Sequence, residues 1–417
     1  MARKKYHSLV IAVIVIIIGL FTALYVSRNR ISEHYLARGS EFLEQKDFDK
    51  AVKYYHKATK WNKRSASPFL GKGKALYYKD DLPAALESIN QSIDRDSIIA
   101  EAYYYRGLIF VKQKDTNRSL EEFSSAISLD SLYALAYYQR GLVKAGMGEL
   151  KNSIEDYKKA IEIDKEMVDA YLMSIEARSA MEDYLGAIED YDRLLAVDSM
   201  NADAYYNRGY FKMSLSNYSS AIDDLSKAIT IKPAFGEAYY HRGVSFAHEK
   251  QFENSIKDFT KAIELKHRMG KSYYNRALSY LHNRNPEKAF ADLKKSVEND
   301  ASDPQSFFLL GVTSSMKGDF KGSVDYYTSA IKLKPDFADA YFNRGVSKGN
   351  LKLHEQAIAD YDKAIELNNK YADAYYSRGL SKINLYRYED ACVDIKTAIS
   401  LGNKPSVELA AQFCQNN

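Results

Sequence analysis

The pattern of apolar and polar residues repeats every 34 residues along most of the chain. Within one period the apolar residues recur at helical spacing in two segments, which a short polar turn separates. In the copy that begins at Ala338, the pattern predicts a first helix over roughly 339–351 and a second over roughly 355–367. A fixed period of roughly 20 to 50 residues is typical of a solenoid, in which each repeat packs on its neighbours.

Eleven such repeats follow one another over residues 32–405 without insertion or deletion. Their predicted bounds are 32–65, 66–99, 100–133, 134–167, 168–201, 202–235, 236–269, 270–303, 304–337, 338–371 and 372–405. Residues 406–417 begin like another first helix and then stop, which predicts a C-terminal capping helix. The predicted fold is therefore all-α, an α-solenoid of helix pairs.

Several positions within the repeat, numbered 1 to 34, carry a constant residue type. Position 8 is Gly in nine repeats, position 20 is always Ala or Ser, and position 27 is Ala or Ser in all but one. Gly inside a helix costs about 0.5–1 kcal/mol relative to Ala, so its recurrence predicts a close approach of the two helices. Position 4 is always aromatic and position 24 is aromatic or aliphatic, and we expect both sets to fill the core.

This pattern, with an aromatic residue at 4, Gly at 8, Ala at 20, an aromatic residue at 24, Ala at 27 and Pro at 32, resembles the tetratricopeptide repeat family. Pro233 and Pro335 match the last position, where the other repeats have Ser, Lys, His, Asn or Ala. The resemblance covers about nine-tenths of the chain. It implies antiparallel helix pairs stacked into a right-handed superhelix, whose first helices line a concave groove that binds other proteins.

A charge pair recurs at positions 7 and 23. Its members are Arg106 and Glu122, Arg140 and Asp156, Arg208 and Asp224, Arg242 and Asp258, Arg276 and Asp292, Arg344 and Asp360, and Arg378 and Asp394. The ninth repeat loses both members together, having Leu310 and Tyr326. This joint loss predicts that the two side chains meet between the helices of one repeat, where they fix the helix register rather than perform chemistry.

The fifth repeat departs most from the pattern. Ser174 replaces the Arg, Ile175 replaces the Gly, and Leu194 replaces the small residue at position 27. Larger or altered side chains at these three positions are expected to splay the helix pair, which would change the local curvature or leave a softer joint between two halves.

By the same resemblance, positions 2, 5, 6, 9, 12 and 13 of the first helix line the groove. The candidate binding residues are Tyr104, Tyr138, Asp203, Tyr206, Asn207, Glu237, Tyr240, His241, His248, Tyr274, Asn275, His282, Asp339, Phe342, Asn343, Asp373 and Tyr376. The rings at position 5 either contact a ligand or pack on the next repeat. The acids at position 2 either complement the helix dipole or favour a cationic or extended peptide.

Two more specific kinds of site are not supported by these residues. Asn207, Asn275 and Asn343 match the central Asn with which some members of the family grip a C-terminal carboxylate, but the flanking repeats lack the accompanying Lys, Asn and Arg. His241, His248 and His282 are expected to be solvated groove residues, since no Cys or carboxylate completes a metal-ligand spacing. We therefore predict no metal and no cofactor.

The net charge of +4 comes from residues 1–30, which hold five basic residues and no acid. The rest of the chain is balanced, which argues against a nucleic-acid binder. The chain has no P-loop, nucleophile elbow or zinc motif, so no enzymatic activity is predicted. The two cysteines give no disulfide framework and do not reveal the compartment. Cys392 is expected to be a buried inert thiol, and Cys414 an exposed one.

The N-terminus consists of a basic tail, 1–8, and an uncharged apolar stretch, 9–26. As a helix this stretch would be ~27 Å long, close to the ~30 Å thickness of the hydrocarbon core. A cleaved signal peptide is the alternative, but the apolar run exceeds the usual length and no small-x-small cleavage site precedes Arg28. Trp61, near the end of the first repeat, occupies a position that is aliphatic in most later repeats. It is expected to pack in the core, with a contact at the membrane interface as the alternative.

The sequence thus predicts a single-pass protein of the bacterial cell (inner) membrane. The basic tail favours a cytoplasmic N-terminus and repeats on the non-cytoplasmic side, although Arg28 and Arg30 on the other flank weaken this bias. The predicted function is a membrane-tethered scaffold that binds a partner protein or an extended peptide in its groove. A binding module for a polysaccharide, or an accessory subunit of a membrane assembly complex, is the alternative.

Overall fold

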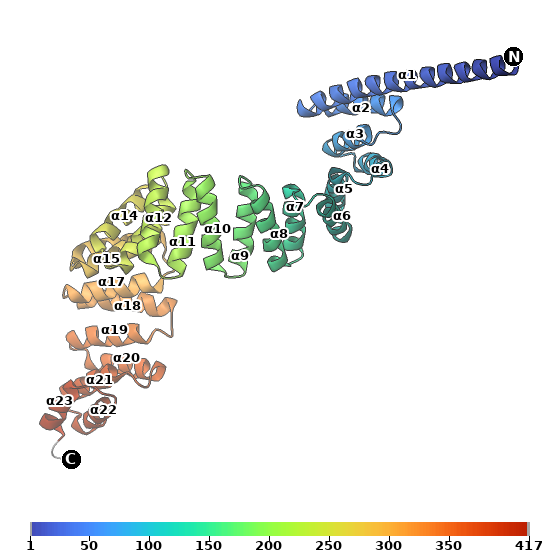
Figure 1. The fold of residues 1–417 in the computed structure, drawn as a ribbon. Coiled ribbons are helices and arrows are strands. Elements are labelled where there is room, and N and C mark those ends of the chain that lie inside the picture. The colour runs from blue at the N-terminus through green and yellow to red at the C-terminus, as the bar shows by residue number, and fades with distance from the viewer. Residues whose placement is uncertain (1, 415–417) are drawn as a thin grey trace. The chain divides into compact units, whose positions relative to one another are not determined.

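The computed structural model describes residues 2–414, with side chains from Ala12 onward, as 23 α-helices without a β-strand. Each repeat supplies one odd-numbered first helix and one even-numbered second helix (Figure 1). The helices are α1 Ala2–Glu44, α2 Phe48–Trp61, α3 Ser67–Tyr78, α4 Leu82–Ile93, α5 Ala100–Lys112, α6 Thr116–Leu129, α7 Ala134–Gly146, α8 Leu150–Ile163, α9 Val168–Ala180, α10 Tyr184–Val197, α11 Ala202–Ser214, α12 Tyr218–Ile231, α13 Gly236–His248, α14 Phe252–Glu264, α15 Met269–His282, α16 Pro286–Asn299, α17 Pro304–Met316, α18 Phe320–Leu333, α19 Ala338–Asn350, α20 His354–Leu367, α21 Ala372–Asn384, α22 Tyr388–Ser400 and α23 Pro405–Phe413. The predicted all-α solenoid is confirmed.

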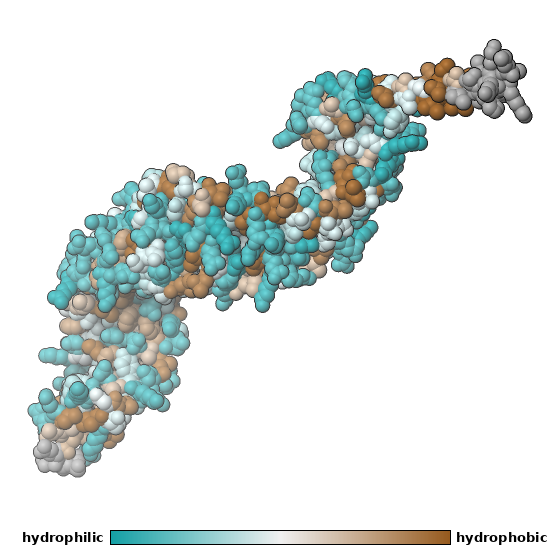
Figure 2. All heavy atoms as spheres, viewed as in Figure 1, coloured by the Kyte–Doolittle hydropathy of each residue, from teal (hydrophilic) through white to brown (hydrophobic). Residues whose placement is uncertain are grey.

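Helix α1 joins three segments that the sequence treats separately. The basic tail, the apolar stretch and the first helix of the first repeat form one uninterrupted helix, because no Gly, Pro or capping residue stops it after Val26. From Val13 to Val26 the large apolar side chains are exposed, and Figure 2 shows them as a band on α1. With a mean hydropathy of 1.9 in its most apolar stretch, the helix is long and apolar enough to cross a membrane.

The residues at positions 8 and 24 hold the two helices of each repeat together. All eleven side chains at position 24 are buried, among them Tyr55, Phe123 and Ile395. A Cβ atom added at Gly107 would lie 2.7 Å from the Phe123 ring, and one at Gly345 would lie 2.7 Å from Tyr361. The Gly at position 8 therefore makes room for the large side chain at position 24, which confirms the predicted close approach.

The aromatic residues at position 4 are less buried than predicted. Only Phe69 and Tyr171 are buried, and the other nine rings are partly exposed. In seven repeats the guanidinium of the Arg at position 7 lies over this ring, as Arg140 does over Tyr137 at 5.5 Å. The ring therefore covers the charge pair described below instead of filling the centre of the core.

The fifth repeat has its two helices farther apart than the other repeats do. Ile175 and Leu194 are buried in place of small residues, and the backbones of α9 and α10 approach one another less closely than those of the two helices of any other repeat. The predicted splaying is therefore confirmed. Residues Met1–Ser199 and Met200–Asn417 form two compact units, and the division falls at the end of this repeat.

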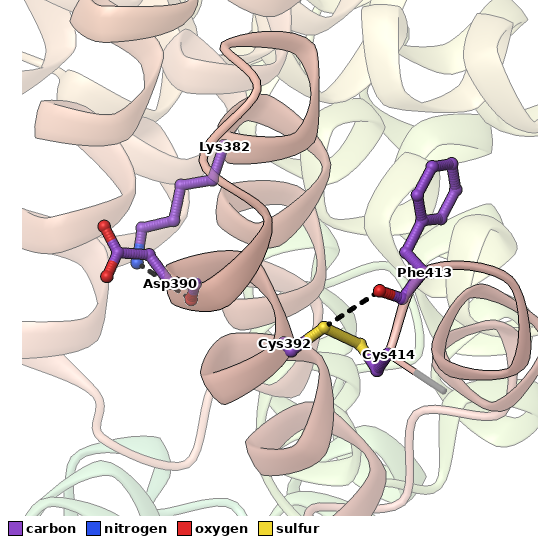
Figure 3. The surroundings of a disulfide bond; sticks show 5 residues. All are labelled: Lys382, Asp390, Cys392, Phe413 and Cys414. Atoms are coloured by element: carbon purple, nitrogen blue, oxygen red, sulfur yellow. Dashed lines mark hydrogen bonds between the residues drawn. A yellow bond between two sulfur atoms is a disulfide. The ribbon is translucent and has the colours of Figure 1, made fainter. Parts of the chain in front are cut away.

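The C-terminal cap contains a disulfide that the sequence interpretation did not predict. Cys392 on α22 is bonded to Cys414, which directly follows α23, with a Cα–Cα distance of 5.6 Å (Figure 3). Cys392 is buried as predicted, but the predictions that it is a free thiol and that Cys414 is an exposed one were wrong. Helix α23 folds back onto α22 and brings together two cysteines that are 22 residues apart. The last predicted cap residues, 415–417, lie outside the described part of the chain.

Candidate binding groove

The first helices are held in place by the charge pairs at positions 7 and 23, which meet as predicted. In six repeats the Arg donates two hydrogen bonds to one Asp: Arg242 Nε and Nη2 donate to Asp258 at 2.7 and 2.8 Å. Arg106 lies 2.9 Å from Glu122 without this bidentate geometry, and burial raises the pKa of Glu122. In the ninth repeat, buried Leu310 packs against Tyr326, so an apolar contact replaces the ion pair.

Two further groups complete these pairs, and the sequence interpretation missed both. In four repeats a Lys at position 11 also reaches the Asp, as Lys348 does with Asp360 at 2.8 Å. In four repeats the remaining Nη1 of the Arg donates to a hydroxyl on the second helix of the preceding repeat, as Arg242 does to Ser226 at 3.0 Å. Their recurrence at fixed positions was the signal that could have revealed them.

The fifth repeat preserves the pair in altered form. Ser174 donates a hydrogen bond of 2.6 Å to Asp190, and Arg178, one helical turn later, lies 2.8 Å from the same carboxylate. The charge therefore moves from position 7 to position 11, where other repeats carry the Lys.

The aromatic residues at position 5 lie largely inside their own repeat. Tyr104 packs on Phe123 at position 24 and on Tyr133 at position 34, with ring centroids 5.9 and 5.0 Å apart. Phe342 packs in the same way on Tyr361 and Tyr371. Tyr104 and Tyr240 are buried, and burial raises the pKa of Tyr104 to about 12. Partly exposed rings remain at Tyr138, Tyr206, Tyr274, Phe308, Phe342 and Tyr376.

The exposed acids at position 2 contact the segment that connects their repeat to the next. Asp339 accepts a hydrogen bond of 2.9 Å from the Tyr371 hydroxyl, and Asp373 accepts one of 2.7 Å from Asn403. Asp203 lies 3.5 Å from Lys232. These carboxylates keep an open side toward solvent, so contact with a ligand is compatible with their structural role.

Two adjoining cavities lie along α13, α15 and the start of α17. The larger, of about 480 Å³, is lined by Tyr240, Tyr274 and Asn275 together with Lys271 and Gln305. The smaller, of about 190 Å³, is lined by Asn275 again and by Leu278, Val244, His248 and His282. We call these two cavities the groove segment; its lining comes mainly from the first-helix positions that the resemblance indicated.

Asn275 is the residue shared by both cavities. Its amide nitrogen donates a hydrogen bond of 3.1 Å to the Tyr240 hydroxyl, which fixes the side chain between them. Asn343 instead donates to the Asp339 carbonyl of its own helix. Asn207 is partly buried and lines neither cavity. The structure therefore brings only one of the three candidate Asn residues into the groove segment.

The three histidines do not form a cluster. His241 is buried among the rings of Tyr206, Tyr210 and Tyr240, so the expectation that it is solvated was wrong. Burial, helped by nearby Arg268, lowers the pKa of His241 to about 4. His248 and His282 are exposed and stack on Tyr218 and Phe252, with centroids 4.2 and 4.6 Å apart. Among the side chains described, those of residues 12–414, no three metal-ligating groups come together.

Three sequence profiles match the chain. A profile described as "Tetratricopeptide repeat" matches residues 33–65, 134–167, 202–235, 236–266 and 270–303, and a second with the same description matches 70–134. A third, described as "TPR repeat", matches 179–214 and 353–383. Five of the matched segments begin within one residue of a predicted repeat boundary. No curated protein matches the chain.

Many solved structures are similar to parts of the chain. The C-terminal part of a TPR repeat-containing protein from Cytophaga hutchinsonii is 18% identical, with a TM-score of 0.49 over 56% of this chain and 97% of that one. A tetratricopeptide repeat protein from Parabacteroides merdae is 18% identical, with a TM-score of 0.43 over 60% and 99%. YrrB, described as a TPR protein with an unusual peptide-binding site, is 21% identical, with a TM-score of 0.43 over 46% and 99%.

Proposed function

Since the chain belongs to the tetratricopeptide repeat family, we propose that it is a membrane-tethered scaffold that binds an extended segment of a partner protein in the groove segment. The supporting observation is the pair of adjoining cavities that share Asn275. Partly exposed Tyr274 supplies a flat apolar surface, and Asn275 and Gln305 supply amide groups that match a peptide backbone. The role is binding, and we propose no catalytic residue.

The tether in this proposal is helix α1. Its exposed apolar side chains have no protein partner within the described residues, and a lipid bilayer would remove them from water. A cleaved signal sequence would have similar composition, so retention of the segment is part of the proposal. Mass spectrometry of the protein from washed membranes tests it, since cleavage would yield a chain that lacks residues 9–26.

We further propose that the repeats lie on the non-cytoplasmic side of a bacterial inner membrane. The disulfide between Cys392 and Cys414 supports this side, because disulfides persist in oxidising compartments and are rare in the cytosol. Protease added to intact spheroplasts is expected to degrade residues 32–417. Protection of this region would contradict the orientation.

Site-specific photo-crosslinking tests the binding site. A photoreactive residue in place of Leu278 lies in the groove segment, whereas one in place of exposed Lys257 lies on the neighbouring second helix α14. We expect a discrete protein adduct in native membranes from position 278 and none from 257. Adding Asn275→Ala is expected to lower the yield about fivefold or more, as for a central contact residue.

The same experiment separates the proposal from its alternatives. Equal adducts from positions 278 and 257 would show that the groove segment is not the binding surface. Absence of protein adducts, together with binding of the detergent-solubilised chain to a glycan array, would favour the polysaccharide-binding alternative instead.

A further inference from the structure

A third cavity, of about 360 Å³, lies where α1 emerges from its apolar stretch and meets the C-terminal end of α2. Leu24, Tyr25 and Trp61 form part of its apolar wall. Trp61 is 41% exposed, so the expectation that it packs in the core was wrong. Trp61 is the last residue of α2, and its indole lies at the surface beside α1.

The polar side of this cavity consists of cations. Arg28 from α1 and Lys60, Lys63 and Arg64 from the end of α2 and the following turn line it, and its lining contains no carboxylate. All four side chains are exposed. None of them forms a salt bridge with any side chain from residue 12 to 414, whereas many cations of the later repeats are paired. The cavity therefore combines an apolar wall with uncompensated positive charge.

The turn that presents these cations is held firmly on α1. The Asn62 amide donates a hydrogen bond of 3.0 Å to Asn29, and its carbonyl oxygen accepts from the backbone N–H groups of Arg64 and Ser65 at 3.0 and 3.1 Å. Ser32 on α1 donates a buried hydrogen bond of 3.0 Å to the Ala58 carbonyl. The cavity is therefore a preformed feature of the junction between α1 and the first repeat.

We propose that this cavity binds the anionic headgroup of a membrane phospholipid, with the acyl chains along the apolar face of α1. The inference rests on the proposed membrane tether, which places the cavity at the edge of the bilayer. Tryptophan favours this interface, and basic side chains there attract anionic lipids. A bound lipid would hold the first repeat, and with it the start of the solenoid, against the membrane surface.

Trp61 is the only tryptophan of the chain, so its fluorescence reports on this cavity without labelling. The full chain is reconstituted in nanodiscs that contain phosphatidylcholine and phosphatidylglycerol, with bromine quenchers on the acyl chains of one lipid or the other at equal mole fraction. We expect brominated phosphatidylglycerol to quench Trp61 more strongly than brominated phosphatidylcholine. Equal quenching by the two lipids would overturn the proposal.

The variant Lys60→Gln/Lys63→Gln/Arg64→Gln keeps the fluorophore and removes three cations. Its preference for the anionic lipid is expected to fall at least about fivefold, since each basic residue near an anionic surface contributes on this order. The matched control Lys158→Gln/Lys165→Gln/Lys227→Gln removes three exposed cations from other repeats and is expected to keep the preference. An equal loss in both variants would assign the effect to net charge and overturn the cavity as its source.

Failure of the tether has a different outcome. If α1 does not span the membrane, the full chain will not co-purify with the nanodiscs after a high-salt wash. If it co-purifies but Trp61 shows no preference for the anionic lipid, the tether stands and the lipid site is disproved.

Discussion

At the scale of single residues, the recurrence of Arg at position 7 and an acid at position 23 predicts the charge pairs correctly. It does not predict the other groups that bond to each pair. The joint absence of Arg and acid in the ninth repeat is enough to predict that the two side chains touch. The Lys at position 11 bonds to the Asp of the pair, and the hydroxyl on the preceding repeat bonds to the Arg. Both were missed because the Arg and the Asp had already been assigned to each other. Asp156, which is 5% exposed, is reached by both Arg140 and Lys144, and both cations compensate its lost hydration.

The pair Arg242–Asp258 allows a clean double-mutant cycle, because Asp258 has no second cation within salt-bridge distance among the described residues. Asp258→Leu leaves a partly buried Arg unpaired and is expected to destabilise the fold by about 3 kcal/mol or more. Arg242→Leu/Asp258→Leu should cost clearly less than the sum of the single changes. Urea unfolding followed by circular dichroism measures the three variants, and additive effects would show that the pair does not couple.

His241 gives the fold a dependence on mildly acidic pH. Because the pKa of His241 is about 4 when folded and ordinary when unfolded, only the unfolded chain takes up this proton between about pH 6.5 and 4. The free energy of unfolding is therefore expected to decrease as the pH is lowered through this window, by about 3 kcal/mol for this residue. His241→Phe should flatten the dependence, measured as hydrogen exchange of α13, and exposed His248→Phe should not.

At the scale of elements, helix positions followed from the repeat, but helix ends depended on geometry that the pattern does not encode. Position 15 lies in the left-handed region in all eleven repeats, yet it is Gly in only two. The other nine residues, including Tyr386 with φ 63°, are held there by the turn between the two helices. The disulfide of the cap was likewise hidden, because it depends on which segments lie next to one another.

The cap supplies the test at this scale. The disulfide closes a loop of about two dozen residues, for which chain entropy predicts a stabilisation of about 3 kcal/mol. Cys414→Ser, or reduction of the native chain, should expose α23 to hydrogen exchange while the middle repeats keep their protection. Cys392→Ser under non-reducing conditions should match the reduced protein. Unchanged exchange of α23 would mean that packing alone holds the cap.

At the scale of the whole molecule, the 34-residue period was sufficient to predict the architecture, because the same positions supply the packed side chains in every repeat. The location of a binding surface was not predictable in the same way. Position 5 is aromatic in eight repeats, and two of these rings, Tyr240 and Tyr274, line the larger cavity of the groove segment. Which repeats carry function depends on the small departures from the period, such as Gly270 and Gln305 in the lining of the larger cavity.

The same repetition makes the tyrosines a collective determinant of stability at high pH. Burial raises the pKa of Tyr104 to about 12, and it raises the pKa values of Tyr55, Tyr157, Tyr327 and Tyr361 at position 24 as well. The folded chain therefore keeps protons that the unfolded chain releases near pH 10, so stability should fall as pH rises above about 10. Helical circular dichroism should stay constant from pH 8 to 10 and be lost cooperatively by about pH 12.

Tyrosinate absorbance at 295 nm, followed in parallel, distinguishes this mechanism from general charge repulsion. If burial of tyrosine controls the transition, a second wave of ionisation will coincide with the loss of helix, and the chain in concentrated urea will show only one wave near pH 10. Ionisation that is complete before the helices melt would contradict it. Because buried tyrosine rings lie in several repeats of both compact units, the transition is expected to involve both units and not one end of the chain.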